Sequence, residues 1–123
     1  MPCTPGGWGR YRSMSLSPLA ALAEQAFEPR AARMKEPEVD ALLAVLPGWS
    51  RSDGRVVKTF RFGNYHETIA FVNAVAWIAQ RADHHPDLSV HYDHCVVAFT
   101  THDAAGITQR DLVCAARVER LRA

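Results

Sequence analysis

Residues 64–103 read NYHETIAFVNAVAWIAQRADHHPDLSVHYDHCVVAFTTHD, and the change of pattern inside this stretch decides the fold prediction. In its first half, apolar side chains recur every three or four residues, which is the period of an α-helix with one buried face. Asn64 is a suitable N-cap, and Glu67 stands where it can reach back toward that cap. Pro86 cannot continue a helix, so we expect the helix to end near Ala82.

The second half of the stretch predicts a β-hairpin. Apolar and polar side chains alternate from Leu88 to Tyr92, which is the pattern of a strand. A second apolar run follows from Cys95 to Thr101. Two strands separated by so short a segment are expected to pair antiparallel.

The residues upstream predict the same order of a helix followed by a hairpin. Pro37 suits the first turn of a helix, and apolar residues at helical spacing carry the pattern to Leu46. Segments 49–51 and 55–62 then flank residues 52–54, a Ser-Asp-Gly cluster of the kind that forms turns.

The residues downstream predict a final helix. Gly106 interrupts the chain after the second hairpin, and Thr108 is a suitable N-cap. Asp111 then occupies the third helical position, where a carboxylate can cap the start of a helix. Apolar residues continue at helical spacing toward Leu121.

The predicted fold class is α+β, in the order helix, two strands, helix, two strands, helix. We expect a two-layer sandwich in which the helices cover one face of a four-stranded antiparallel sheet. This domain is predicted to span residues 35–123. Residues 1–34 are interpreted as an N-terminal extension that is poorly structured or forms one short helix, for which Ser17 and Pro18 would be the start.

Composition narrows the classes of function. The 123 residues are 48% apolar, which suits one domain with a sizeable core. Fourteen Lys and Arg against thirteen acidic residues give no broad charge for binding nucleic acid or an anionic membrane. Three cysteines, Cys3, Cys95 and Cys114, form no CxxC pair and favour a reducing, cytoplasmic location. No stretch is apolar enough to predict a membrane span.

Histidines concentrate between the second helix and the end of the last strand. His84 and His85 follow the helix directly, and Pro86 restricts the backbone there. His102 ends the last strand, which an antiparallel sheet could return to the same place. Imidazole titrates near neutrality, so a cleft with three such rings suggests proton transfer or metal binding. The alternative is that each ring is merely solvated or caps an element end.

A zinc site is the main chemical alternative, since imidazoles together with Asp83 or Asp103 could bind the ion tetrahedrally. Adjacent histidines cannot easily ligate one ion, however. His91 and His94 differ in strand parity and are expected to face apart. We therefore expect no metal and no bound cofactor.

The spacing of these residues resembles the signature of the pterin-4a-carbinolamine dehydratase family. The resemblance covers roughly Glu36 to Leu121, and several positions must agree at once, which makes it specific. The matching positions are Gln80-x3-His84-His85-Pro86-x5-Tyr92-x9-His102-x8-Asp111, with Pro47-Gly48-Trp49, Thr59-Phe60-Arg61-Phe62, Thr101-His102-Asp103 and Arg110 in the flanks. The chain departs at Gln80, which is usually acidic in the family, and at Leu88, which is aromatic in animal members.

The resemblance implies dehydration of a 4a-hydroxytetrahydropterin to the quinonoid dihydropterin, which recycles the cofactor of aromatic amino acid hydroxylases. It assigns His84 and His102 to proton transfer at the departing hydroxyl, and His85 to the opposite part of the ring. Asp111 would orient a histidine or the pterin, although a plain helix cap explains it equally well. By the same resemblance, further substrate contacts would come from Pro86, Thr101, Asp103, Trp49 and Tyr92. For the two aromatic residues, core packing is the alternative.

The resemblance also implies a homodimer or homotetramer, with pterin as the small-molecule partner and no direct contact with nucleic acid. Covering an exposed sheet edge is a physical reason for such assembly. Trp77 lies off the main apolar face of its helix and is a candidate interface residue. The alternative is that it simply completes the core. The alternative function is a non-enzymatic module for pterin binding, oligomerisation or coactivation.

Overall fold

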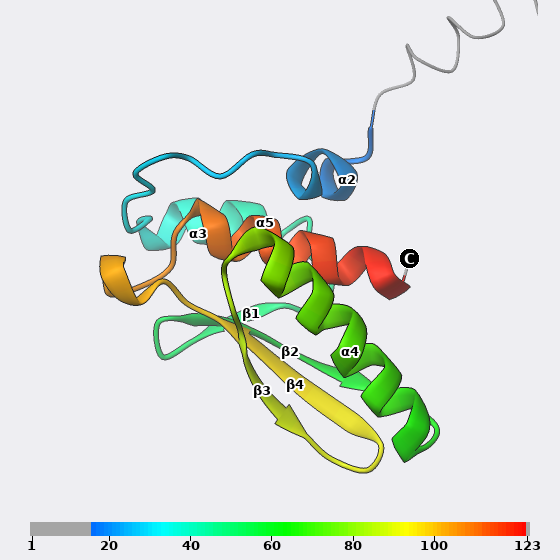
Figure 1. Ribbon diagram of the computed structural model, residues 1–123. Coiled ribbons are helices and arrows are strands. Elements are labelled where there is room, and N and C mark those ends of the chain that lie inside the picture. Colours follow the sequence, from blue (N-terminus) through cyan, green and yellow to red (C-terminus); the bar gives the residue numbers. More distant parts are fainter. Residues whose placement is uncertain (1–15, 123) are drawn as a thin grey trace, which may run out of the picture.

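The computed structural model describes residues 16–122, which form a helical layer over one face of a sheet (Figure 1). The elements in chain order are α2 (Pro18–Ala23), α3 (Glu36–Leu43), β1 (Ser50–Ser52), β2 (Arg55–Arg61), α4 (Tyr65–Ala82), β3 (Asp87–Val90), β4 (His94–Phe99), the 3-10 turn η1 (His102–Ala104), α5 (Gln109–Glu119) and the 3-10 turn η2 (Arg120–Arg122). The predicted order of three helices and two hairpins is confirmed, with α2 added in front.

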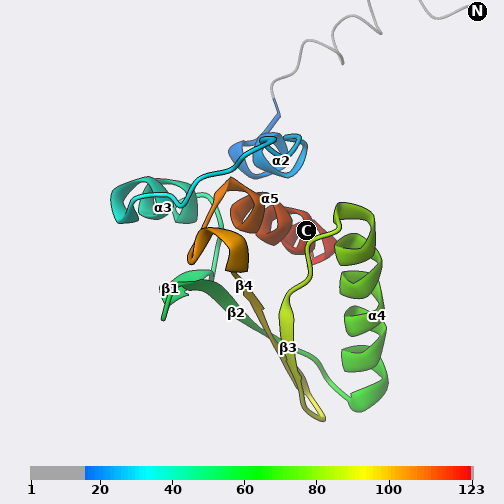
Figure 2. The ribbon, with the colours of Figure 1, turned by 60° about the vertical axis from the view of Figure 1, so that its left-hand side comes forward.

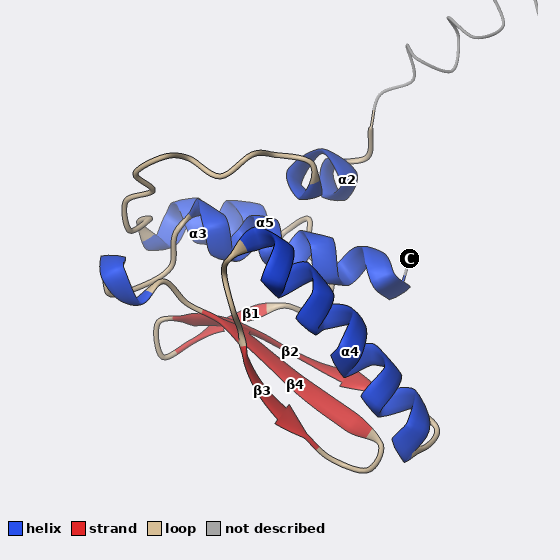
Figure 3. Ribbon diagram, viewed as in Figure 1, coloured by secondary structure: helices blue, strands red, loops and turns tan. Residues whose placement is uncertain are grey.

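The four strands form one sheet in the order β1-β2-β4-β3, and every neighbouring pair is antiparallel (Figure 3). α3, α4 and α5 lie on the same face of this sheet, as two views of the chain show (Figures 1 and 2). The α+β two-layer sandwich predicted from the periodicity is therefore confirmed. The central strand β4 leads directly through residues 100–101 into η1, so the sheet delivers the predicted His102 segment to the layer of helices.

The first hairpin closes through the predicted turn. Ser52 pairs with Arg55, and the two residues between them, Asp53 and Gly54, have φ angles of 51° and 73°. Positive φ at both positions defines a type I′ turn, whose twist matches that of the flanking strands. The Asp-Gly pair supplies this geometry at low conformational cost.

The core lies between the sheet and the helices, and α5 forms its centre. Leu112 and its neighbours up to Ala116 are fully buried because α5 is covered by the sheet below and by α2, α3 and α4 around it. The strands contribute alternate residues, as a sheet with one buried face requires. These inward residues are Val56 and Phe60 of β2 and Cys95, Val97 and Phe99 of β4.

Two sequence expectations differ from the structure in detail. The first helix was expected to reach Leu46, but α3 ends at Leu43, and Leu46 is buried from a tighter turn in which its N–H donates to the Leu43 carbonyl. Such i to i+3 turns preserve the apolar spacing over one turn, so periodicity alone does not distinguish them from α-helix. The last strand was expected to reach Thr101 but ends at Phe99.

The predicted short helix after Ser17 is also present. The Ser17 hydroxyl accepts the Ala20 N–H at 3.1 Å, and Pro18 begins α2. Leu22 and Ala23 are each only 3% exposed because α2 packs against α5. Among the described helices, none combines the length and the apolar character that a membrane crossing requires.

Two free cysteines provide a test of this core. Cys95 and Cys114 are fully buried, and burial raises the pKa of both thiols. The pKa of Cys114 rises to about 12, mainly through burial; nearby Arg117 opposes the rise and Asp111 adds to it. Because the thiolate is the reactive form, iodoacetamide at about pH 8 should modify neither residue in the native protein and both after unfolding. Peptide mass spectrometry measures the modification, and rapid native labelling of Cys114 would contradict the packing.

Candidate active site

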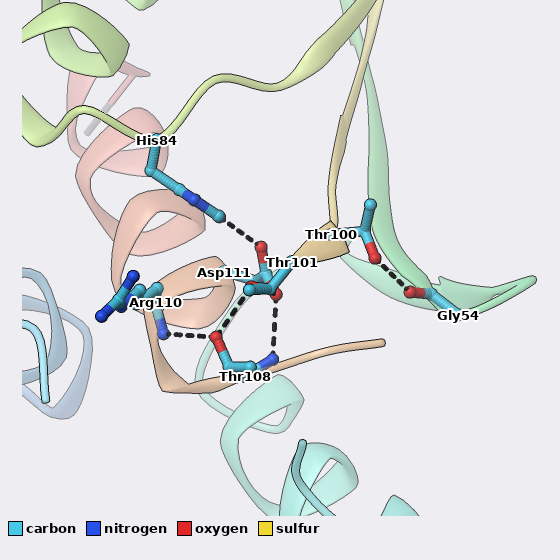
Figure 4. A network of polar contacts seen from close by, with 7 residues as sticks. All are labelled: Gly54, His84, Thr100, Thr101, Thr108, Arg110 and Asp111. Atoms are coloured by element: carbon cyan, nitrogen blue, oxygen red, sulfur yellow. Dashed lines mark hydrogen bonds and ion pairs between the residues drawn. The ribbon is translucent and has the colours of Figure 1, made fainter. Parts of the chain in front are cut away.

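A buried carboxylate joins the segments that carry the predicted site. Asp111 is fully buried, and its two oxygens accept three hydrogen bonds (Figure 4). Oδ2 accepts the Thr108 N–H at 2.9 Å and the Thr101 hydroxyl at 2.8 Å. Oδ1 accepts a hydrogen bond from His84 Nε2 at 2.6 Å. Asp111 therefore caps its helix, as its sequence position predicts, and hydrogen-bonds a histidine at the same time.

The end of α4 places His84 beside this carboxylate. Asp83 adopts the left-handed conformation with φ 50°, and its N–H donates to Gln80 while the His84 N–H donates to Ala79. This is a Schellman motif, which closes the last turn of a helix and redirects the chain. Aspartate tolerates the left-handed region better than most residues. The chain is thus turned back toward α5 at the first histidine.

Aromatic rings and burial hold the His84 imidazole in its orientation. The ring stacks on Phe99 of β4 at 6.0 Å between centroids and 9° between planes. Phe27, from the segment before α3, approaches the same imidazole edge-on at 6.0 Å and 85°. The His84 side chain is consequently only 12% exposed. Nε2 is committed to Asp111, which leaves Nδ1 as the ring nitrogen available for other chemistry.

Two threonines extend the network to η1. The Thr101 and Thr108 hydroxyl oxygens lie 2.8 Å apart, and Thr101 donates its own proton to Asp111. Thr108 is therefore the donor in the pair, which gives the hydrogen bonds one direction toward the carboxylate. The backbone of Thr101 also bridges Gly106 through two hydrogen bonds of 3.0 and 3.3 Å. The loop that carries His102 is thereby closed at its base.

The remaining predicted histidines lie next to this network but outside it. His85 follows His84 and is exposed, and Pro86 after it is partly buried. His102 and Asp103 are exposed on η1, directly after Thr101. Within residues 16–122, no hydrogen bond joins the three imidazoles to one another. The structure thus brings His84, Thr101 and Asp111 into one hydrogen-bonded network. That network does not include His85, Pro86, His102 or Asp103.

A cleft of about 380 Å³ opens beside Thr101. It is lined by residues 30–33, Thr101, Asp103, Ala104 and Arg110. Its volume lies within the range of small-molecule pockets. A larger hollow of about 920 Å³ lies between the start of α3 and the β1–β2 turn, but it contains none of the predicted site residues. The smaller cleft is therefore the better candidate for a ligand that reaches the network.

The structure places Trp49 and Tyr92 away from this cleft. Trp49 is 5% exposed, packs on Phe60 and Phe99, and donates its indole N–H to Glu119 at 2.9 Å. Tyr92 is 66% exposed in the turn between β3 and β4, at the opposite end of that hairpin from His84. Core packing explains the tryptophan, and neither ring is among the residues that line the cleft.

The second histidine pair differs from expectation. His91 and His94 were expected to face apart, but their rings stack at 4.2 Å because these residues face each other across the two-residue turn of the β3–β4 hairpin. Across-turn pairing, not strand parity, decides their relative position. In the part of the chain that the structure describes, no three His, Cys, Asp or Glu side chains are grouped so that they could hold a metal ion.

Sequence reasoning missed two contributors to the site. Thr108 was interpreted only as a helix cap, although its spacing from Asp111 already indicated that both side chains meet at the helix start. Phe27 was placed in the extension, and no periodicity or motif around it points to His84. Its role depends on a contact between residues far apart in sequence, which only the fold reveals.

Comparison with known proteins identifies the family. Residues 32–121 match the sequence profile described as pterin 4 alpha carbinolamine dehydratase. The chain belongs to this family. A relative from Chromobacterium violaceum is 58% identical over 83 residues, which cover 68% of this chain and 77% of that protein. A relative from Stenotrophomonas maltophilia is 46% identical over 111 residues, covering 86% of this chain and 96% of that protein. Both carry, provisionally, the name pterin-4-alpha-carbinolamine dehydratase.

A solved structure of the family has the same fold. The crystal structure of a transcriptional coactivator/pterin dehydratase from Brucella melitensis has a TM-score of 0.71 and 27% identity, and the comparison covers 74% of this chain and 99% of that one. Membership of the dehydratase family assigns the chain to the hydro-lyases, enzymes that eliminate water from a substrate. The match to the Stenotrophomonas relative is longer than the family profile and takes in part of the segment before residue 32.

The buried network predicts the effect of replacing Asp111. Asp111→Asn keeps the shape of the side chain but turns one acceptor into an amide donor, which must face a donor already present. The free energy of unfolding should fall by about 2 kcal/mol, because a buried polar group loses its partner. Urea unfolding measures this loss. Asp103→Asn removes an exposed carboxylate from the neighbouring η1 turn and should change stability by less than about 0.5 kcal/mol; equal effects of the two substitutions would contradict the account.

Proposed function

We propose that this chain dehydrates a 4a-hydroxytetrahydropterin to the quinonoid dihydropterin, by acid and base catalysis from histidine side chains. The observation that carries the proposal is the His84–Asp111 pair in a member of the dehydratase family. Thr101, which donates a hydrogen bond to Asp111, also lines a cleft of ligand size. In this role the protein recycles the pterin cofactor that aromatic amino acid hydroxylases oxidise. The two free, buried cysteines fit a reducing compartment, and we place the reaction in the cytoplasm.

The reaction requires two proton movements. The bond between the bridgehead carbon and its hydroxyl oxygen breaks as a proton reaches that oxygen, and water leaves. A second proton departs from a ring nitrogen, so that the new double bond carries the electron pair. Groups that titrate near neutrality suit both proton transfers, and imidazole is such a group. It can carry out both transfers without a metal.

His84 is the best supported of the catalytic histidines. Asp111 fixes the Nε2 proton, so Nδ1 can take part in proton transfer at the hydroxyl. The carboxylate also stabilises the imidazolium that forms when the ring accepts a proton. The low exposure of the His84 side chain reduces competition from bulk water for this hydrogen bond.

The other site residues are assigned by their place around the cleft and by family resemblance. His102 stands between Thr101 and Asp103, two residues that line the cleft, and shares the proton transfer at the hydroxyl. His85 acts on the opposite part of the ring, and Pro86 restricts its backbone. Asp103 binds the pterin from η1. No metal and no further cofactor enter the scheme.

Assembly into a homodimer or homotetramer accompanies this function. On α4, Trp77 is 65% exposed, and Arg81 lies over its ring at 5.7 Å. A large exposed ring on an outward helix face favours an interface between protein surfaces. The alternative function is a non-enzymatic module that binds pterin or acts through assembly. Assembly would use the exposed face of α4 around Trp77, and neither role requires proton transfer.

Two substitutions test the catalytic assignment. His84→Ala and His102→Ala should each lower the rate of 4a-hydroxytetrahydropterin dehydration by roughly ten- to a thousandfold, the ordinary contribution of an acid or base. His66→Ala, which removes an exposed imidazole near the start of α4, is the matched control and should leave the rate unchanged. Stopped-flow absorbance measures dehydration, and circular dichroism verifies the fold of each variant.

Three outcomes would count against the proposal. Full activity in both variants would remove the histidines from the mechanism. A wild-type protein that binds the pterin without dehydrating it would favour the binding module. Stoichiometric zinc in the purified enzyme, lost together with activity in the variants, would favour a metal mechanism.

A further inference from the structure

The chain between α2 and α3 runs past the start of α5 (Figure 2), where Gln109 and Arg110 donate hydrogen bonds to its backbone. We call residues 24–34 the strap. It has no regular secondary structure, yet α5 binds its backbone at many points, and the Met34 N–H donates to the Ile107 carbonyl at 2.8 Å. The predicted domain boundary at residue 34 assigns the strap to the extension. Its contacts place Phe27 against His84, one of the three partners of Asp111.

Gln109 holds the strap on both sides of Phe27. Its amide oxygen accepts the Glu28 N–H at 3.1 Å, and its amide nitrogen donates to the Ala26 carbonyl at 2.9 Å. One side-chain amide therefore pairs with the two backbone groups that flank a single residue. Gln109 is 9% exposed, and a buried amide satisfied in this way fixes backbone position closely.

Two arginines of α5 also bind the backbone of this segment. Arg110 donates to the Glu28 and Pro29 carbonyls at 3.2 and 3.3 Å, and Figure 4 shows it directed away from Asp111 toward the N-terminal segment. Arg117 donates to the Ala23 and Gln25 carbonyls at 3.0 and 2.9 Å. Both guanidinium groups also lie against the Phe27 ring, at 5.6 and 5.3 Å from its centroid. Such cation–π contacts add to the fixation of the ring.

These contacts with α5 hold Phe27 of the strap against His84. The phenyl ring meets the imidazole edge-on at 6.0 Å, whereas Phe99 stacks parallel to it. With Asp111 at Nε2, the His84 ring is therefore held by two aromatic contacts and one hydrogen bond. Gln109 and Asp111 lie two positions apart in the first turn of α5, so one helical turn positions both the hydrogen-bond partner and the aromatic neighbour of the histidine.

We propose that the strap is part of the active site and that Phe27 is a positioning residue for His84. By covering the imidazole, Phe27 keeps water from competing for the Nε2 hydrogen bond and restricts rotation of the ring. The proposal rests on the proposed function in one respect, because its kinetic consequence requires that His84 take part in proton transfer. Its structural consequence does not depend on that function.

The kinetic test uses the full chain and the substitutions Phe27→Leu and Phe27→Tyr. Phe27→Leu should lower kcat about tenfold and leave KM within about twofold, because the affected group acts in the chemical step. Phe27→Tyr keeps the aromatic ring and should restore most of the activity. A rise in KM with kcat unchanged, or equal activity in both variants, would overturn the proposal.

A spectroscopic test separates the proposal from the proposed function. The ring-proton signals of His84 in the substrate-free protein, assigned through His84→Ala, should shift in Phe27→Leu and stay near their wild-type positions in Phe27→Tyr. If the wild type proves inactive on the pterin, the proposed function fails, and these signals still decide whether Phe27 positions the imidazole. Unshifted His84 signals in Phe27→Leu would overturn the positioning role.

Gln109→Met provides an independent test of the same arrangement in case Phe27→Leu does not fold. It removes the amide that binds the backbone around Phe27 and leaves the aromatic residue in place. It should reproduce the loss in kcat, and the double variant with Phe27→Leu should lose little more than either single variant, because both disturb one arrangement. Additive losses would contradict a shared role. Tyr65→Leu, which removes an exposed aromatic ring at the start of α4, is the matched control and should leave kcat unchanged.

Discussion

The burial of one carboxylate, that of Asp111, is the constraint on which the rest of the site depends. A charge removed from water destabilises a protein unless hydrogen bonds and opposite charge compensate it. Here the compensation comes from the Thr108 backbone, the Thr101 hydroxyl and the His84 imidazole. These three partners lie on α5, after β4 and after α4, so satisfying one charge requires three parts of the fold to meet.

This arrangement makes the geometry of the candidate site a consequence of folding. The Schellman motif after α4 turns the chain at His84, and β4 delivers Thr101 to the same carboxylate. At the start of α5, Gln109 and Arg110 bind the strap and thereby hold Phe27 against the imidazole. The first turn of α5 thus connects helix capping, histidine orientation and attachment of the N-terminal segment. The His84 ring is held by residues that also form the structural framework of the fold.

The sequence predicts the elements well because each depends on a local signal. Helical spacing, caps at Asn64 and Thr108, the Asp-Gly turn and the block at Pro86 all act within a few residues. The position of Asp111 predicted a helix cap, which the structure confirms, and the same carboxylate hydrogen-bonds His84. Trp49 and Tyr92 could not be placed in this way, because stacking on a ligand and packing in a core use the same residue type.

The contacts between the strap and α5 also could not be predicted from one sequence. The sequence around Phe27 gives no sign of its contact partners, and the order of this segment comes from side chains of α5 that lie more than eighty positions away. Polar side chains that bind backbone leave no periodic pattern in the segment they bind. The predicted division at residue 34 therefore follows composition, whereas the packing of the chain continues across it.

The most direct test of the central claim is the protonation of the His84 ring itself. Nitrogen–proton correlation spectra of histidine side chains, recorded at about pH 8, distinguish the two neutral tautomers and reveal protons protected from exchange. The account predicts that His84 carries its proton on Nε2, in slow exchange with water, and that this signal disappears in Asp111→Asn. A proton on Nδ1, or an Nε2 proton that exchanges as rapidly as that of an exposed histidine, would contradict it.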